Sequence, residues 1–575
     1  MTLQRAETGL WEFSARTREE NLERMSRETF DIAVIGGGAT GAGIARDAAM
    51  RGLSVCLAER GDFATGTSSR SSRLLHGGLR YLETYDFKLV HEACLERRKL
   101  GQLAPHLSVP IPFLFPVYED SSTGWLLLKA GMLTYDLMAM FRNYRNHRSY
   151  RAQGLAGIEP ELNRVGLKGG FVYYDARTDD GRLTLATILS AANHGAVLAN
   201  YAAVTALPCS GGKIHGIVVR DVLGGREVEV RAQQVIDAAG PWSDDIRSMD
   251  PTAQQRVLRP TKGVHFVARR EDLPVRHAVV MTDQGRVMFV IPWGAFVYVG
   301  TTDTDISAPF DEPFATAEDI DYLLSVVAKS FPHRRLTESD IISTWAGIRP
   351  LVDPQQAVAA GKVSREHRLY ESPAGLISIC GGKLTTYRLM AAQTVSRALR
   401  YITSAAAAHA PRSTPTGGEP LIGGEMGDPL TGLPREFEEP ALIPCITRDI
   451  RAHLYQQYGS RGLAVAAMAA EQPEYCGAMI PGLPFIHIEI LHAVRHEMAV
   501  RLADVLIRRL PVLYQAPDQG LALAPRAAEI MARELSWTPE RTAEEIAEYG
   551  REVALNRQFR RQDDALPRNA PDSAR

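Results

Sequence analysis

The chain has 575 residues, of which 45% are hydrophobic and 23% charged, and its formal net charge is −2 at pH 7. This length predicts roughly two to four domains that each bury a core, and the composition is that of a globular protein. The small net charge argues against nucleic acid and against a bulk acidic partner. No uninterrupted apolar run is long enough to predict a membrane-spanning helix.

The cysteines and the first residues of the chain indicate its compartment. The cysteines are scattered and form no C-x-x-C pair: Cys56, Cys94, Cys209, Cys380, Cys445 and Cys476. This spacing predicts neither a zinc site nor a disulfide framework, and it indicates a reducing compartment. No His/Cys cluster has the spacing of metal ligands, so we expect no bound metal. Residues 1–27 are polar and charged, unlike a signal peptide, and we expect an irregular or helical lead-in.

A glycine-rich turn follows the first apolar segment of the chain. Residues 30–35 form a short apolar run, as in a buried parallel strand. Gly36, Gly38 and Gly41 then give the spacing G-x-G-x-x-G. In this motif the first glycine permits a tight turn, the second lets backbone approach a pyrophosphate, and the third lets the next helix pack closely. The helix expected up to residue 51 would present its N-terminal N–H groups to phosphates.

A second strand, expected over residues 53–58, ends at Glu59. An acid about 20 residues beyond the glycines can accept hydrogen bonds from ribose hydroxyls. Together with the strand before the glycines and the helix after them, Glu59 predicts a dinucleotide-binding site. The alternative is a glycine-rich turn in an ordinary α/β domain.

The segment after Glu59 is polar and rich in small residues. Residues 60–73 suit an extended loop laid along a phosphate-bearing ligand, since they offer hydroxyls and N–H groups. His76 follows beside two glycines, where backbone can approach a flat ligand. The alternative for His76 is a turn histidine bonded to backbone.

Residues 125–141 predict a helix with apolar residues on most faces. Four arginines follow it closely, at positions 142, 145, 148 and 151. An apolar helix flanked by cations fits a membrane-surface contact. It fits equally well a core helix that ends in a solvated basic turn, because cations favour the C-terminal end of a helix.

Three later segments predict a return to the first domain and a second sheet. Residues 235–242 and 376–380 are buried strands followed by small residues, and strands also dominate residues 259–304. The last of these ends at Thr302 and Asp303, and Arg349 precedes a proline on a stiff turn. Lys383 follows two glycines at the start of a helix, where backbone can meet a ligand. Lys383 is either catalytic or a solvated cation near the cap.

The last third of the chain is predicted to be helical. Residues 405–418 contain prolines and a Gly-Gly pair and predict a linker. Residues 491–505 have apolar positions at three- and four-residue steps. Glu497 and Arg501 have the spacing of an exposed helical ion pair. Residues 558–575 are charged and contain proline, which predicts disorder.

These motifs together resemble the FAD-dependent glycerol-3-phosphate dehydrogenases over about residues 30–509. The most specific stretches lie at residues 67–83, 237–242, 345–350 and 381–388, and residues 458–462 and 493–499 also match. The resemblance implies oxidation of sn-glycerol 3-phosphate to dihydroxyacetone phosphate, with FAD as cofactor and a membrane quinone as final acceptor. It further implies a cytoplasmic enzyme on the inner face of the plasma membrane. Apolar helices in the last third make a homodimer plausible.

The resemblance also implies roles for individual residues. Arg80, Tyr81 and Arg365 would hold the phosphate, while Arg349 and Lys383 would face the substrate hydroxyl and the flavin, with Thr302 nearby. A base would take the hydroxyl proton, and His76, His265 and Lys383 are the candidates. The positions implied to contact FAD are Gly36, Gly38, Gly41, Glu59, Thr67, Ser68, Ser69, Gly77, Gly78, Ala239, Gly240, Trp242, Gly382, Lys383, Leu384 and Thr385.

The expected fold class is α/β, with a Rossmann-type FAD-binding domain of the glutathione-reductase and D-amino-acid-oxidase kind. It is interleaved with an antiparallel substrate-binding sheet and followed by an all-α domain. The expected segments are a lead-in at 1–29, FAD-binding segments at 30–110, 197–245 and 346–404, a cap region at 111–196, the substrate sheet at 246–345, a linker at 405–418, a helical domain at 419–557 and a tail at 558–575.

Two other functions remain open from the sequence. One is an FAD-dependent oxidase of a small hydroxy acid or amine, or of glycerol 3-phosphate itself with oxygen as acceptor. In an oxidase of hydroxy acids or amines, Arg80 and Arg349 would hold a carboxylate. The other is a flavin-bearing regulatory or assembly protein that uses the helical domain as its partner surface.

Overall fold

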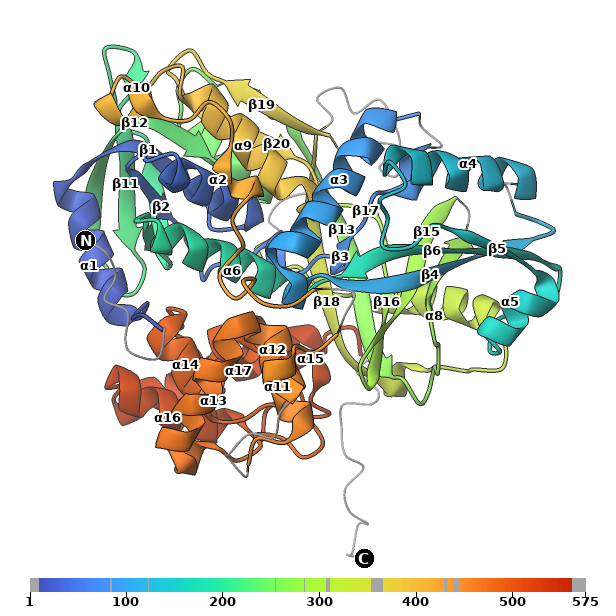
Figure 1. Cartoon of the computed structure of the whole chain (residues 1–575). Coiled ribbons are helices and arrows are strands. Elements are labelled where there is room, and N and C mark those ends of the chain that lie inside the picture. Colours follow the sequence, from blue (N-terminus) through green and yellow to red (C-terminus); the bar gives the residue numbers. More distant parts are fainter. Residues whose placement is uncertain are drawn as a thin grey trace, which may run out of the picture.

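The computed structural model (Figure 1) consists of two sheet-based parts side by side and a helical domain packed against them. The structure describes residues 10–82, 85–121, 124–253, 255–283, 285–306, 311–352, 366–428, 432–438 and 445–560, with only the backbone of Arg80. Arg365 and most of the predicted tail at residues 558–575 therefore lie outside the described residues.

The first sheet is assembled from segments that are far apart in the sequence. Its strand order is β19-β20-β12-β1-β2-β7, and β1 lies parallel to both β12 and β2. The antiparallel strands β11 and β8 continue it from β12. The bounds are β1 Thr29–Ile35, β2 Val55–Ala58, β7 Val197–Ala199, β8 Ala202–Ala206, β11 Gly216–Asp221, β12 Glu227–Asp237, β19 His367–Glu371 and β20 Ile377–Gly381.

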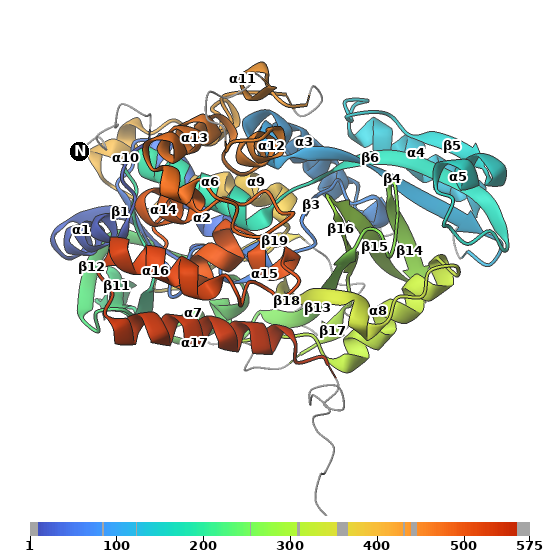
Figure 2. The same ribbon diagram turned by 90° about the horizontal axis from the view of Figure 1, so that it is seen from below.

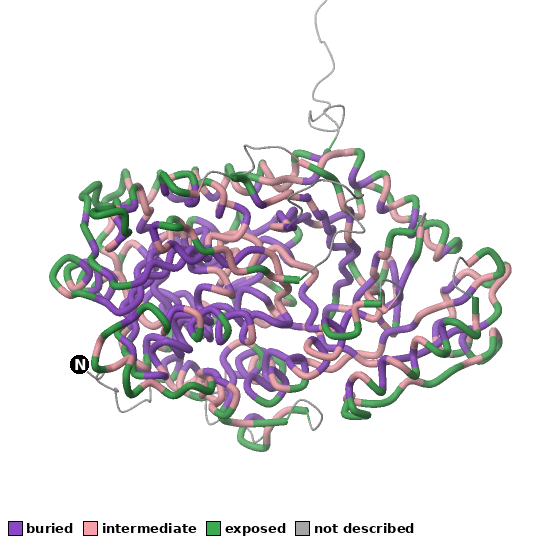
Figure 3. The backbone as a smooth tube through the Cα atoms, turned by 90° about the horizontal axis from the view of Figure 1, so that it is seen from above, coloured by how far each residue is buried: buried purple, intermediate pink, exposed green. Residues whose placement is uncertain are grey.

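Helices cover both faces of this sheet, because its parallel strands are apolar on both sides. One face packs against α2 Ala39–Met50, α6 Asp180–Asn193 and α9 Tyr387–Ala398. The other face packs against α1 Ala15–Arg27, whose Leu22 and Met25 are buried among strand residues. The first sheet is accordingly the most buried part of the backbone in Figure 3.

In the described part of the chain, the second sheet has ten strands, in the order β17-β13-β16-β15-β14-β4-β6-β3, with β18 beside β13 and β5 beside β6. It is almost wholly antiparallel; β14 and β4 form a parallel pair. One face packs against α8 Ala317–Ser330. The bounds are β3 Leu74–Leu75, β4 Val109–Tyr118, β5 Arg148–Arg151, β6 Leu167–Arg177, β13 Leu258–Arg269, β14 Ala278–Asp283, β15 Arg286–Trp293, β16 Phe296–Gly300, β17 Thr304–Asp305 and β18 Ile341–Val352.

An arm extends from the second sheet at β4, β5 and β6. It carries α4 Trp125–Met138 and α5 Ala152–Ile158, and α3 Phe87–Leu103 runs back toward the first sheet. Much of this arm is exposed or half-buried (Figure 3), and large apolar side chains of α4 face outward. The helix expected over residues 125–141 ends three residues early, at Met138.

The helical domain contacts both sheets (Figure 2). It contains α11 Arg435–Glu438, α12 Arg448–Tyr458, α13 Gly462–Glu471, α14 Ile488–His496, α15 Val512–Gln515, α16 Ala524–Leu535 and α17 Pro539–Asn556. The side-chain oxygen of Asn556 accepts from the Thr344 N–H of β18 at 3.0 Å. Arg182 of α6 makes two 2.8 Å hydrogen bonds to the Glu497 carboxylate, and Asp62 binds Arg508 and Arg509. Buried ion pairs therefore join this domain to the first sheet.

The N-terminal lead-in is helical and joins two parts of the molecule. The Arg18 side chain donates to the Asn200 carbonyl at 2.8 Å and pairs with Asp221, both on the first-sheet side. The Phe13 N–H donates to the Arg495 carbonyl at 3.0 Å, and the Phe13 carbonyl accepts from Met498 at 2.6 Å. Residues 10–27 therefore lie between the first sheet and the helical domain.

Several expected boundaries were wrong. The first FAD-binding segment was expected to reach residue 110, but β3 at Leu74–Leu75 already belongs to the second sheet. The chain returns to the first sheet with α6, before the expected residue 197. Strand β18 stays in the second sheet up to Val352, although the boundary was expected after residue 345. The reason is that an apolar strand pattern does not reveal which sheet the strand joins. The expected linker at 405–418 packs against the first domain, where Arg46 and Arg51 donate to its carbonyls.

Two side-chain expectations also differ from the structure. Glu497 is fully buried and binds Arg182, so it forms no exposed pair with Arg501. Cys445 and Cys476 are joined by a disulfide with a Cα–Cα distance of 6.1 Å, although their spacing of 31 residues predicted no bridge. In both cases a partner distant in the sequence decided the outcome.

Candidate active site

The glycine turn between β1 and α2 leaves no space for side chains. Gly36 has φ +103°, and a Cβ there would lie 2.7 Å from the Ala238 carbonyl oxygen. A Cβ on Gly41 would lie 1.9 Å from the Gly36 carbonyl oxygen. Since the first-turn N–H groups of a helix lack carbonyl partners within it, this turn exposes hydrogen-bond donors and the positive end of α2.

Two polar side chains converge on the same turn. Glu59 follows β2, and its carboxylate accepts from the Gly37 N–H at 2.6 Å and from the Gly61 N–H at 2.9 Å. Burial raises the pKa of Glu59 above its ordinary value. The Ser68 hydroxyl accepts from the Ala39 N–H at 2.9 Å, at the start of α2. The loop at residues 67–69 and the end of β2 thus meet at the glycine turn.

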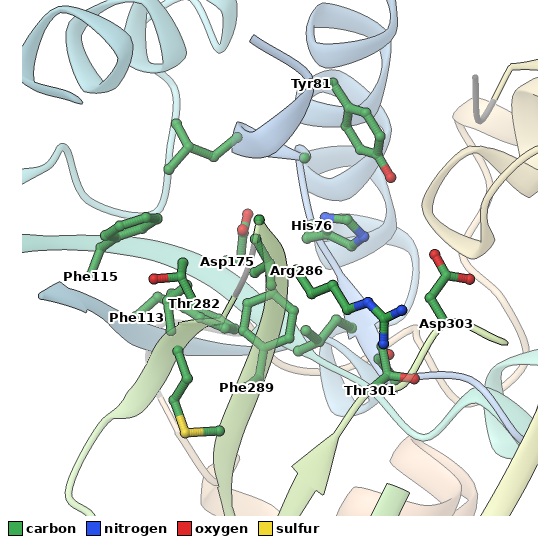
Figure 4. Close-up of a pocket in the computed structure, with 18 of the residues that line it drawn as sticks. His76, Tyr81, Phe113, Phe115, Asp175, Thr282, Arg286, Phe289, Thr301 and Asp303 are labelled. Atoms are coloured by element: carbon green, nitrogen blue, oxygen red, sulfur yellow. The ribbon is translucent and has the colours of Figure 1, made fainter. Parts of the chain in front are cut away.

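A cavity of about 1750 Å³ lies between the second sheet, α4 and the start of α9 (Figure 4). Eleven of the residues singled out from the sequence line it: Thr67, His76, Gly78, Tyr81, His265, Thr302, Arg349, Gly382, Lys383, Leu384 and Thr385. His76, Arg349 and Lys383 come from three distant segments, so the structure brings the three central candidates into one cavity. Arg365 and the Arg80 side chain lie outside the described part.

The remaining predicted residues lie beside the glycine turn or behind the cavity wall. Ala239, Gly240 and Trp242 follow β12, next to Gly36. The Trp242 indole donates to Asp311 at 2.8 Å, and the Arg60 guanidinium lies 4.3 Å from the centre of the Trp242 ring. The buried Ser69 ends the short helix that contains Ser68.

A hydrogen bond and a cation–ring contact hold the His76 and Lys383 segments together. The His76 N–H donates to the Thr385 hydroxyl at 3.0 Å. The Lys383 ammonium lies 3.5 Å from the centre of the Tyr81 ring, a distance at which the ring face attracts a cation. A Cβ on Gly78 would lie 3.3 Å from that ammonium. The two glycine-rich stretches therefore place a cation and an imidazole in one wall of the cavity.

Arg349 enters the cavity from β18. Its guanidinium donates to Asp303 at 3.1 Å, to the Thr301 hydroxyl at 2.8 Å and to the Thr302 carbonyl at 3.1 Å. The Thr302 hydroxyl accepts from the Val264 N–H at 3.0 Å, so it is engaged with β13. These contacts fix the orientation of the Arg349 guanidinium. Two of its partners, Thr302 and Asp303, are the residues at which the sequence predicted a strand to end.

His265 forms part of the cavity floor. Its Nε2 lies 2.9 Å from the Ser72 hydroxyl, and its ring stacks on Trp345 with centres 4.8 Å apart. Burial and the nearby charges of Arg349 and Arg73 hold the pKa of His265 well below its usual value. The lowered pKa makes His265 a weak base.

One group at the site was missed by the sequence reasoning. The Gly77 N–H donates to the Tyr135 hydroxyl of α4 at 3.0 Å, and that hydroxyl donates to Asp175 at 2.7 Å. Arg97 donates to the same hydroxyl at 2.9 Å and pairs with Asp175. This network supports the turn after His76 from behind. No local motif could indicate it, since its members come from α3, α4 and β6.

The described residues fit FAD, the cofactor implied by the resemblance. The glycine turn and the N-terminus of α2 suit the pyrophosphate, and Glu59 suits the ribose hydroxyls. Four glycines line the cavity, at positions 78, 263, 347 and 382, and a Cβ at any of them would lie within 2.5 Å of a protein atom, so the cavity wall packs closely only with glycine at these positions. Lys383 would place a positive charge beside the flavin ring.

Gly36→Ala should reduce FAD binding by about tenfold or more, because a positive φ and a backbone contact both oppose the new methyl group. The measurement is the ratio of bound FAD to protein after gel filtration. Gly52→Ala is the matched control: Gly52 has φ +82° but nothing within 4 Å of its added Cβ. Equal FAD content in both variants would contradict the assignment of the turn.

Comparisons with known proteins identify relatives of this chain. Residues 31–388 match the family model described as FAD dependent oxidoreductase, and residues 414–542 match the C-terminal domain of alpha-glycerophosphate oxidase. The chain is 38% identical over 534 residues to glycerol-3-phosphate dehydrogenase of Mycobacterium leprae, covering 92% of this chain and 89% of the relative. It is 35% identical to aerobic glycerol-3-phosphate dehydrogenase of Staphylococcus haemolyticus, covering 91% and 94%. The FAD complex of glycerol-3-phosphate dehydrogenase from Bacillus halodurans has a TM-score of 0.78 at 32% identity, covering 95% and 99%.

Proposed function

The chain belongs to the family of FAD-dependent glycerol-3-phosphate dehydrogenases, with FAD as its cofactor, and from this premise we propose a specific reaction and acceptor. The reaction is oxidation of sn-glycerol 3-phosphate at C2 to dihydroxyacetone phosphate, and the acceptor is a membrane quinone. The observation that carries the proposal is the convergence of His76, Arg349 and Lys383 on one cavity.

FAD supplies an acceptor for the hydride that leaves C2. The cations of Arg349 and Lys383 stabilise negative charge that develops on the C2 oxygen as its proton leaves. We assign the removal of that proton to His76 rather than His265. His265 is engaged with Ser72 and has a strongly lowered pKa, whereas general bases work best with a pKa near the working pH.

The phosphate group requires its own cations. Arginine binds a phosphate through two parallel N–H···O contacts, and we assign this role to Arg80 and Arg365. Tyr81, which lines the cavity beside Lys383, would add a hydroxyl.

Anaerobic mixing with glycerol 3-phosphate should bleach the bound FAD, whereas glycerol at the same concentration should bleach it at least about a hundredfold more slowly, because it lacks the phosphate that fixes the bound geometry. The measurement is the loss of the visible absorbance of the flavin in a stopped-flow instrument. Equal bleaching by both compounds would contradict phosphate recognition, and bleaching by neither would overturn the proposed reaction.

The quinone acceptor implies contact with a membrane surface. Within the described residues, no helix is both long and apolar enough to cross a membrane. The outer face of α4 exposes Leu126, Leu127, Leu133 and Leu137, which are 80%, 68%, 52% and 56% exposed. Exposed arginines follow at positions 142, 145, 148 and 151. An exposed apolar helix beside cations is suited to an anionic lipid surface, so we propose peripheral binding through α4.

Oxygen as the acceptor is the second candidate. The helical domain matches a model named after alpha-glycerophosphate oxidase, which favours this alternative. Steady-state assays separate the two: an oxidase consumes oxygen and forms peroxide stoichiometrically with glycerol 3-phosphate. A quinone-linked dehydrogenase turns over rapidly with a quinone and slowly in air.

A further inference from the structure

The cavity extends beyond the residues assigned to the flavin and the substrate. Ligand pockets commonly have volumes of about 300–1,000 Å³, and this cavity has about 1750 Å³. The residues assigned to the flavin and the substrate occupy its end near Lys383 and Arg349. The other end reaches beneath α4, and we call this end the α4 lobe.

The α4 lobe is lined mainly by apolar side chains. Phe113 and Phe115 of β4 and Phe289 of β15 project into it, together with Val280 of β14, which lies on the same face of the sheet. The rings of Phe113 and Phe289 meet edge to face with centres 5.8 Å apart. Figure 4 shows the three phenylalanines grouped on one side of the pocket, with Thr301 and Asp303 on the other. The lobe therefore suits an apolar ligand that lies next to the redox end of the cavity.

The roof of the lobe is the same helix that carries the exposed leucines. Leu127, Leu128 and Gly131 of α4 line the cavity, and Leu127 is also 68% exposed. On the inner side of the helix, Tyr135 binds the Gly77 N–H beside His76. The apolar surface of the molecule is thus continuous with the wall of the cavity.

We propose that the α4 lobe is the binding site of the acceptor quinone, with the quinone ring toward the His76 and Lys383 end. The isoprenoid tail leaves beneath α4, past Leu127, toward the lipid surface. This inference rests on the proposed quinone-linked function. The two electrons and two protons that leave the C2 carbon and its hydroxyl group then reside on the quinone, which becomes a quinol.

The test is to fill the lobe at a position that has space for a side chain. A Cβ added to Gly131 meets nothing within 4 Å, so Gly131→Leu narrows the lobe without a clash at the Cβ. In detergent solution, we expect glycerol 3-phosphate to bleach FAD at the wild-type rate. Reoxidation by a quinone with a long isoprenoid tail should slow by about tenfold or more, because the tail loses buried apolar contacts. Reoxidation by a tailless, water-soluble quinone should change by less than about threefold.

Two further variants keep the test specific. Gly157→Leu is the matched control, because Gly157 is an exposed helical glycine of α5 with the same open space and lies outside the lining of the cavity. Leu127→Glu is a second probe at an exposed position, where a charge at the opening of the cavity should slow reoxidation by the tailed quinone in the same way.

Photolabelling maps the binding site without relying on turnover. A tailed quinone that carries a photoreactive group should label residues 109–138 in the wild type and should not label them in Gly131→Leu.

The outcomes separate this inference from the proposed function. If glycerol 3-phosphate fails to bleach FAD in the wild type, the proposed reaction is wrong. If bleaching is normal but both α4 variants react with the tailed quinone at the wild-type rate, the α4 lobe is not the acceptor site. Labelling of a different segment would overturn the inference as well.

Discussion

Lys383→Met should lower the anaerobic rate of FAD bleaching by glycerol 3-phosphate by about 10²–10³-fold, the usual effect of removing one group that stabilises charge in the transition state. The ammonium lies against the Tyr81 ring in the wall of the cavity. In the proposed site, its loss would remove positive charge from the neighbourhood of both the C2 oxygen and the flavin. We therefore also expect the reduction potential of the bound FAD to become more negative, since the reduced ring carries more negative charge.

The control for this variant is Lys213→Met, which removes an exposed ammonium from β10 (Lys213–Ile214). It should leave the bleaching rate and the reduction potential unchanged. FAD content should be equal in the wild type and both variants, which separates a catalytic effect from loss of the cofactor. A Lys383→Met enzyme with the wild-type bleaching rate and potential would show that Lys383 is only a cation near the helix start.

Asp62→Asn should destabilise the folded enzyme by about 3–5 kcal/mol, because it removes one carboxylate from a buried ion cluster. Arg508 keeps its pair with Asp504, whereas Arg509 keeps the Glu497 carboxylate only at 4.0 Å. Asp62 is 1% exposed and accepts from Arg508 at 2.7 Å and from Arg509 at 3.0 Å. Since Asp62 belongs to the first domain and the arginines to the helical domain, we expect both domains to separate more easily. The measurement is the midpoint of thermal FAD release at pH 7.

The matched control is Glu529→Gln on α16. Glu529 also binds two arginines, Arg526 and Arg533, but all three side chains are exposed. Exposed pairs contribute about 0–1 kcal/mol, so this variant should resemble the wild type. An equal effect in the two variants would contradict the account of the buried cluster.

The same cluster predicts the pH dependence of stability. Burial alone would raise the pKa of Asp62, but the charges of Arg509 and Arg508 outweigh it and lower the pKa to about 2 from 3.8. A carboxylate whose pKa is depressed by folding stabilises the protein above its unfolded pKa and loses this contribution as the pH falls toward the folded value. The difference in thermal midpoint between wild type and Asp62→Asn should therefore be full above about pH 5 and shrink between about pH 4 and pH 2.

Local sequence signals predicted the parts of the site that local geometry determines. Gly36, Gly38 and Gly41 indicated a strand, turn and helix start because backbone at this turn excludes side chains. His76 and Lys383 were singled out because each lies beside paired glycines, and the structure places both in one cavity. These features depend on a few consecutive residues, which a sequence displays directly.

The features that were missed depend on contacts between distant segments. Glu497 has the spacing of an exposed helical pair, yet α14 ends at His496 and the carboxylate turns inward to Arg182. Tyr135 looked like one more apolar residue of a helix, although its hydroxyl supports the turn at Gly77. Burial and pairing at these positions are set by the tertiary fold, which periodicity does not encode.

The position of the lead-in has a consequence for how the chain is made. Trp11 and Phe13 are translated long before the groups they contact, at Arg495, His496 and Met498, which lie up to 485 residues later. During synthesis this segment cannot form those contacts until residues 495–498 have left the ribosome. Contacts between residues so distant in the sequence form late, because the long loop between them must first close. The segment at Trp11 and Phe13 therefore docks only after the sheets and much of the helical domain have been translated.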